Sequence, residues 1–212
     1  MNKRTLFPIC LFEFQWEQYD QHKQALMDYC YELEQKKTEI HVAPGSKKLL
    51  FESPFTFLDD DRQCVSDLRE FCYQSLWETA VEMNSMYWNG GPKALRIFES
   101  WCHITKNGGY HDVHRHGASS WCGIFYLEPA DSDIGTYNGI NRFYNDIQGH
   151  HADEGSLYMG GYHDQTPTAG QLLIFPGHLL HSALPYFGND PRIVISFNAQ
   201  VINRPIPKDT DV

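Results

Sequence analysis

The sequence predicts an α+β protein, mainly β, in which two helices brace one face of a sheet or barrel. Residues 16–37 and the stretch after residue 61 carry apolar side chains three and four residues apart, which is typical of amphipathic helices. From residue 94 to 204 the chain instead contains short apolar runs bounded by Gly, Pro, Asn or Asp, which is typical of strands. Helices followed by strands favour a β region with helical support.

The two predicted helices differ in the length of their apolar stripe. In residues 16–37 the stripe consists of Leu26, Tyr29, Cys30 and Leu33. The second helix begins after the acidic run 59–61, and its apolar positions recur at helical spacing as far as Tyr87. Gly90, Gly91 and Pro92 then predict the end of the helix.

Four apolar runs in the second half of the chain predict strands, and one long segment predicts a loop. The strands are expected over 94–104, 120–127, 170–176 and 192–202. The segment 128–166 is rich in Gly, Tyr, Asn, Asp and His and lacks the pattern of a helix or a strand. Because long loops in compact domains often cover binding sites, we expect a mobile lid here.

Length, charge and cysteine content limit the class of protein. A chain of 212 residues is the usual size of one domain, so 1–212 is interpreted as a single domain. The formal charge of −10 disfavours nucleic acid and anionic membranes as partners. The six cysteines form no Cys-x-x-Cys pair, and no apolar run is long enough to cross a bilayer, which favours reduced thiols and a cytoplasmic location. The oligomeric state is left open.

The residues that indicate chemistry are histidines close to one acidic side chain. Asp112, His114 and His116 alternate, so an extended backbone would place all three side chains on one face. His181 follows an apolar strand and a Pro-Gly turn. Iron(II) in non-haem oxygenases is usually held by two histidines and one carboxylate on one face, with the remaining positions open. Five other histidines fall mainly in polar stretches and are expected to be exposed, with no metal role: His111, His150, His151, His163 and His178.

Arg192 opens the apolar strand RIVISFN, eleven residues after His181. An arginine on a buried strand needs an anionic partner, and a carboxylate matches its planar fork best.

At these residues the sequence resembles the 2-oxoglutarate and iron(II)-dependent oxygenase superfamily, specifically a bacterial and phage group with a His-x-His first motif. The similarity spans residues 96–200, and the LFP at residues 6–8 also fits; its motifs are H114-R-H116, SWCGIFYL, PTAGQLLIFPGHLLHSALP and RIVISFN. It implies a double-stranded β-helix, a cupin-like jelly roll, over 93–205, with residues 1–92 as helical support and 128–166 as the lid. It also implies His181 as the distal iron ligand, Arg192 as the partner of the far 2-oxoglutarate carboxylate, and Tyr126 as a further cosubstrate contact.

One position departs from the usual pattern of the superfamily. His116 stands where the first motif normally has Asp or Glu. We therefore favour a metal site of His114, His116 and His181, with Asp112 as the alternative carboxylate ligand.

The resemblance implies an iron(II)- and 2-oxoglutarate-dependent dioxygenase, which would use dioxygen to hydroxylate an unidentified substrate with release of succinate and CO2. Two rival interpretations stay open: a three-histidine cupin-type enzyme that does not use 2-oxoglutarate, and a non-catalytic metal-binding barrel.

Overall fold

The computed structural model describes residues 1–2, 9–36, 47–84, 93–145 and 161–203. In chain order its elements are β1 (Phe12–Gln15), α1 (Tyr19–Gln35), β2 (Lys47–Glu52), the short 3-10 helix η1 (Phe57–Asp59), α2 (Gln63–Asn84), β3 (Lys93–His114), β4 (Trp121–Glu128), β5 (Asn141–Tyr144), β6 (Tyr162–Gln165), β7 (Gln171–Pro176), β8 (His181–Tyr186) and β9 (Arg192–Asn203).

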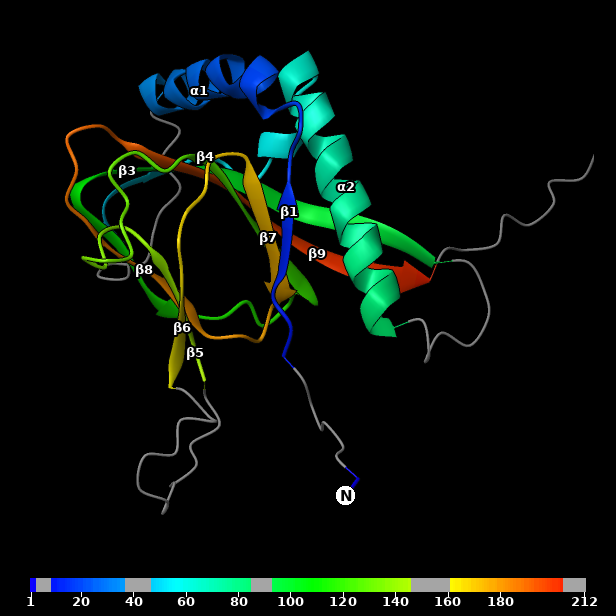
Figure 1. Cartoon of the computed structure of the whole chain (residues 1–212). Coiled ribbons are helices and arrows are strands. Elements are labelled where there is room, and N and C mark those ends of the chain that lie inside the picture. Colours follow the sequence, from blue (N-terminus) through cyan, green and yellow to red (C-terminus); the bar gives the residue numbers. More distant parts are fainter. Residues whose placement is uncertain (3–8, 37–46, 85–92, 146–160, 204–212) are drawn as a thin grey trace, which may run out of the picture.

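The strands form one curled antiparallel sheet in the order β1-β7-β4-β9-β3-β8-β5-β6, with β2 paired to β3. The long strand β3 produces the curl, because it pairs with β9 along residues 93–105 and then with β8 from Gly109 to His114. Figure 1 shows α1 and α2 gathered on one side of the sheet, with β5, β6 and β8 lying away from them. The predicted arrangement, a mainly β protein braced by two helices, is confirmed.

Strand alternation divides the apolar side chains into two cores. On β4, Phe125 and Leu127 belong to the core that the helices cover, whereas Ile124 and Tyr126 belong to the core inside the curled sheet. The helices supply the expected stripe, including Leu26 from α1 and buried side chains from α2. The interior of the sheet is therefore free of helices, and this is where a cavity lies.

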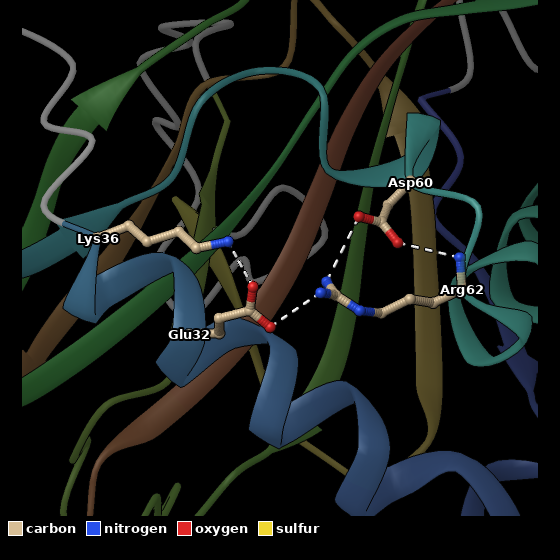
Figure 2. Close-up of polar contacts among 4 residues, drawn as sticks. All are labelled: Glu32, Lys36, Asp60 and Arg62. Carbon is tan, nitrogen blue, oxygen red and sulfur yellow. Dashed lines mark hydrogen bonds and ion pairs between the residues drawn. The ribbon is translucent and has the colours of Figure 1, made fainter.

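Ion pairs connect α1 to the start of α2. Arg62 Nη2 lies 2.8 Å from Glu32 Oε2, and Arg62 also pairs with Asp60 (Figure 2). Lys36 pairs with the same Glu32 carboxylate, and the Arg62 guanidinium stacks 4.0 Å from the ring centroid of Tyr29. Because these charges are largely exposed and screened by water, the pairs contribute little to stability. The apolar core that α1 and α2 share with the sheet supplies most of the stability.

Several expectations need correction. The predicted support region 1–92 also contributes β1 and β2, which pair with β7 and β3. The predicted loop 128–166 contains β5 and β6, an antiparallel pair that extends the sheet. Its short, mainly polar strands lack the apolar run that predicts strands, and pairing with β8 stabilises them instead.

Residues 146–160 of the expected lid, and the predicted helix end at 85–92, lie outside the described residues. None of the helices in the described part of the chain has the length and apolarity needed to cross a membrane.

Candidate metal and cosubstrate site

A cavity of about 450 Å³ opens inside the curled sheet. Its wall includes three of the predicted site residues from different parts of the chain, His114, His181 and Arg192, together with His116. A volume of this size is typical of small-molecule sites. The cavity contains every residue that the sequence predicted for the site except Asp112 and Tyr126, and Tyr126 adjoins it through a hydrogen bond described below.

His114, His116 and His181 form the cluster at the centre of the site. One ring nitrogen from each lies within 4.8 Å of those of the other two. Three nitrogen ligands gathered this closely are a donor set that could hold one transition-metal ion. Among the described residues no carboxylate joins this group.

Backbone pairing brings the three histidines together. His114 is the last residue of β3 and pairs directly with His181, the first residue of β8. His116 lies just beyond β3, where its backbone N–H donates to Gly177 O at 2.8 Å. A side chain at Gly177 would meet Ser119 O at 2.3 Å, so the turn after β3 can approach β7 this closely only because residue 177 is glycine.

Hydrogen bonds to the backbone orient two of the imidazole rings. His114 Nδ1 lies 2.7 Å from Asp112 O, and His181 Nδ1 lies 2.9 Å from Leu179 O. Because a carbonyl oxygen only accepts, each Nδ1 carries the proton and each Nε2 lone pair is available for a metal ion. Burial of His181, together with the nearby His114, lowers the pKa of His181 to about 3, so the neutral ring that a metal ion requires is the stable form.

The backbone carbonyl of Asp112 contacts the histidine cluster, and the Asp112 side chain is exposed. The expectation that Asp112 shares one face with His114 and His116 is wrong for Asp112 alone, because a bulge shifts the register between His111 and His114, whereas His114 and His116 do converge. The bulge leaves the Asp112 side chain exposed and places the rings of His111 and His114 against each other, with centroids 3.9 Å apart. His111, which was expected to be exposed, is half-buried and lines the cavity.

Arg192 lies in the same cavity and is 2% exposed. Its Nη2 donates to Asn141 Oδ1 at 2.7 Å, and the Tyr126 hydroxyl donates to the same oxygen at 3.0 Å. Burial lowers the pKa of Arg192 and raises the pKa of Tyr126. No described carboxylate forms an ion pair with Arg192, and its Nε has no hydrogen-bond partner in the described part of the chain.

Thr105 lies directly opposite Arg192 in the β3–β9 register. The Thr105 hydroxyl is also buried without a hydrogen-bond partner among the described residues. Buried polar groups left without partners are costly and rare in folded proteins, so the unsatisfied Arg192 in the cavity wall favours an acceptor supplied by a ligand. A carboxylate would be such an acceptor.

Sequence reasoning missed several residues of this cavity. Asn141 lines the cavity and falls in the segment expected to be a loop, whereas Thr105, which lies opposite Arg192 and outside the cavity wall, comes just past the end of a predicted strand. Glu52 and His103 form a buried pair in the wall, with Oε2 and Nε2 2.6 Å apart. Glu52 belongs to β2, a strand that the sequence analysis did not predict, so nothing in the sequence connected it to the site. If the predicted strand over 94–104 had been extended as far as β3, its alternation would have placed His103 and Thr105 on one face.

Comparisons with known proteins agree with this description. Residues 99–198 match a family model described as "Putative 2OG-Fe(II) oxygenase". No curated protein sequence matches the chain.

Solved structures of similar fold include two prolyl hydroxylases and an epimerase. A prolyl-4-hydroxylase from Pseudomonas putida is 13% identical with a TM-score of 0.58, and the match covers 92% of each chain. The epimerase SnoN, solved with Fe3+, alpha ketoglutarate and nogalamycin RO, is 12% identical with a TM-score of 0.62 over 95% of this chain and 87% of that chain. A viral collagen prolyl hydroxylase from Paramecium Bursaria Chlorella virus-1, in a 2OG complex, is 14% identical with a TM-score of 0.54 over 89% and 94%.

The curled antiparallel sheet is thus a double-stranded β-helix, as the sequence predicted. Residues 99–198, which supply most of the cavity wall, thus match the 2-oxoglutarate and iron(II)-dependent oxygenases, a family of oxidoreductases that use iron, 2-oxoglutarate and dioxygen.

Proposed function

We propose that this protein is a dioxygenase that binds iron(II) through His114, His116 and His181, binds 2-oxoglutarate through Arg192, and hydroxylates a second substrate. The observation that carries the proposal is the buried Arg192 guanidinium, which shares one cavity with the three histidines and has no carboxylate partner among the described residues. A buried charge without a partner costs several kcal/mol, so a bound dicarboxylate is the ligand that best accounts for it.

The histidine cluster suits a metal ion that needs open positions. Three neutral imidazoles would occupy one side of the ion and leave the cavity side for the cosubstrate and dioxygen. When bound, iron and 2-oxoglutarate supply the oxidising chemistry, in which 2-oxoglutarate is decarboxylated to succinate and CO2 as the substrate is oxidised. His114 and His181 are held in register by the β3–β8 pairing, so the protein need not order them when the ion binds.

At the other end of the cosubstrate, Arg192 would offer the fork of its guanidinium to the far carboxylate. Thr105 would donate a further hydrogen bond from the opposite strand, and Asn141 and Tyr126 would hold the guanidinium in position. Because a shorter keto acid cannot reach the metal site and Arg192 together, this end of the cavity would select a five-carbon dicarboxylate.

Apolar side chains would keep water away from the reacting groups. Phe175 and Phe143 contact the His181 ring at centroid distances of 4.8 Å and 6.0 Å, and Ile124 and Val194 line the same cavity. A dry wall strengthens the electrostatic interactions inside it and prevents side reactions of the reactive centre. The net charge of −10 further supports a substrate other than nucleic acid.

Anaerobic titration with iron(II) and then 2-oxoglutarate tests the proposal. The wild type should bind one iron and develop a weak visible charge-transfer band when 2-oxoglutarate is added. His114→Ala should lose both signals, and the matched control His163→Ala, an exposed histidine on β6 outside the cavity wall, should retain both. An unchanged band in His114→Ala would contradict the ligand assignment.

A second candidate is a three-histidine metal enzyme that does not use 2-oxoglutarate. The absence of a carboxylate from the ligand group among the described residues favours it. One iron bound by the wild type without any band or calorimetric signal on addition of 2-oxoglutarate would support this candidate instead.

A further inference from the structure

The end of the cavity opposite Arg192 carries acidic and aromatic side chains that the proposed chemistry does not use. We propose that this end, formed by Glu99, Asn198, Trp101 and Phe55, binds a cationic nitrogen group of the substrate, an ammonium or a guanidinium. This inference rests on the proposed function, because it takes the metal and cosubstrate positions from it.

The paired strands β3 and β9 form one wall of the cavity, here called the floor. Inward-facing residues lie opposite one another in four successive pairs, which are Thr105–Arg192, His103–Val194, Trp101–Ser196 and Glu99–Asn198. Arg192 and Asn198 are six residues apart on one strand, which corresponds to roughly 20 Å. The cosubstrate cation and Glu99 therefore lie at opposite ends of one floor.

The proposed metal ligands contact the part of this floor near Glu99. The His116 ring stacks on Trp101 at a centroid distance of 6.1 Å. The His181 ring contacts the ring of Phe175 on β7. In the sheet, Phe175 lies opposite Cys122 on β4, and Cys122 lies opposite Asn198 on β9. A group bound at Glu99 would thus lie near the metal site and apart from the Arg192 end.

A bulge in β3 turns Glu99 toward the cavity. The register shifts between Ile97 and Glu99, so that Ile97 lies opposite Ala199 and Glu99 lies opposite Asn198. Without this shift Phe98 would oppose Asn198, and the glutamate would point toward the helix-covered face of the sheet. Bulges are common beside active sites, where they redirect a side chain.

The chemistry of the four side chains fits a cation. Glu99 Oε2 accepts from Asn198 Nδ2 at 2.7 Å, which orients the carboxylate and leaves further acceptor positions on it. Trp101 and Phe55 pack edge to face at 5.2 Å, and a tryptophan face attracts cations more strongly than other aromatic rings. The indole nitrogen of Trp101 is buried without a partner among the described residues, so a ligand that also offers an acceptor, such as an amide carbonyl, would satisfy it.

The charged side chains along the described wall of the cavity also favour a cationic substrate group. Glu52 and Glu99 are its carboxylates, and Arg192 is its one Lys or Arg side chain. Arg192 would be neutralised by the far carboxylate of 2-oxoglutarate, and Glu52 pairs with His103. Among the described residues Glu99 is hydrogen-bonded to the neutral amide of Asn198, so its charge favours a positive group on the incoming substrate.

Matched probes that differ in charge test this subsite. N-acetyl-L-arginine amide is compared with N-acetyl-L-citrulline amide, and N-acetyl-L-lysine amide with N-acetyl-L-norleucine amide. Binding is measured by calorimetry, both with metal-free protein and with protein loaded anaerobically with iron(II) and 2-oxoglutarate. At least one cationic probe should bind more tightly than its neutral partner.

Glu99→Gln keeps the shape and an acceptor for Asn198 but removes the charge. It should weaken the preferred cationic probe by about 10-fold to 100-fold, the effect of losing a hydrogen bond between charged groups, and change the neutral probe little. Glu78→Gln, an exposed glutamate on α2, makes the same change in net charge and should alter neither.

The outcomes separate this inference from the proposed function. Equal binding of charged and neutral probes, or a cationic preference that survives Glu99→Gln, overturns the subsite whatever 2-oxoglutarate does. A preference that Glu99→Gln abolishes supports the subsite even in a protein that fails to bind 2-oxoglutarate, and that failure would overturn the proposed function alone.

Discussion

Replacing Arg192 tests the binding of 2-oxoglutarate, the property that most clearly distinguishes a 2-oxoglutarate enzyme from other metal-binding barrels. Arg192 is 2% exposed and its guanidinium donates a hydrogen bond to Asn141, while its Nε is unsatisfied among the described residues. A dicarboxylate cosubstrate would therefore meet a cation that is already desolvated and oriented. Such a preorganised partner contributes more to binding than an exposed one.

The expected loss follows from that burial. Truncating one member of a buried charge pair costs about 2–5 kcal/mol, so Arg192→Ala should weaken 2-oxoglutarate binding by roughly 30-fold to several thousandfold. Arg192→Lys keeps the charge but loses the two-pronged contact, so its loss should be smaller, about 10-fold to 100-fold. Iron binding should survive both changes because the histidine ligands are untouched.

Calorimetric titration of anaerobic, metal-loaded protein measures these affinities directly. Pyruvate, a keto acid without the far carboxylate, should bind Arg192→Ala nearly as well as it binds the wild type. Arg142→Lys is the matched control, because Arg142 pairs with Asp164 on the β5–β6 hairpin and lies outside the cavity wall. An unchanged 2-oxoglutarate affinity in Arg192→Ala would refute the assigned role, as would an equal loss of pyruvate binding.

Three further predictions concern the ligands and their surroundings. Asp112→Asn should retain stoichiometric iron, measured by metal analysis after gel filtration, whereas His116→Ala should lose it; the reverse result would make Asp112 the carboxylate ligand. Thr105→Val should weaken 2-oxoglutarate binding by about 10-fold to 100-fold, the value of one hydrogen bond to a charged group, and an unchanged affinity would place the carboxylate elsewhere. The pKa of His181 is lowered from 6.5 to about 3 in the folded protein, so below pH 6.5 the unfolded chain binds more protons than the folded one. The free energy of unfolding therefore decreases as the pH falls from 6.5 toward 3. At pH 5 the metal-free protein should be about 2 kcal/mol less stable than at pH 7.5 from this group, and His181→Gln should flatten that part of the urea-unfolding profile against pH.

Local periodicity was sufficient to predict the elements that bury apolar faces. The stripe containing Leu26 and Cys30 predicted α1, and the apolar runs 120–127, 170–176 and 192–202 predicted β4, β7 and β9. Burial of apolar surface can be predicted from local sequence, because an apolar pattern of period 2 or 3.6 corresponds to one buried face of a single strand or helix. Strands without such a pattern, β5 and β6, were missed for the same reason.

The sequence by itself determined which residue types were available for the site: His114, His116 and His181 as candidate ligands, with Arg192 as the candidate anion partner. It left open whether Asp112 or His116 completes the ligand group, because that depends on side-chain direction. Only the tertiary structure decided the direction, since the bulge between His111 and His114 exists through pairing with β8, a strand some seventy residues away. A shift of one residue in register exchanges the two faces of a strand, and register between distant strands is a property of the folded sheet that no local pattern records.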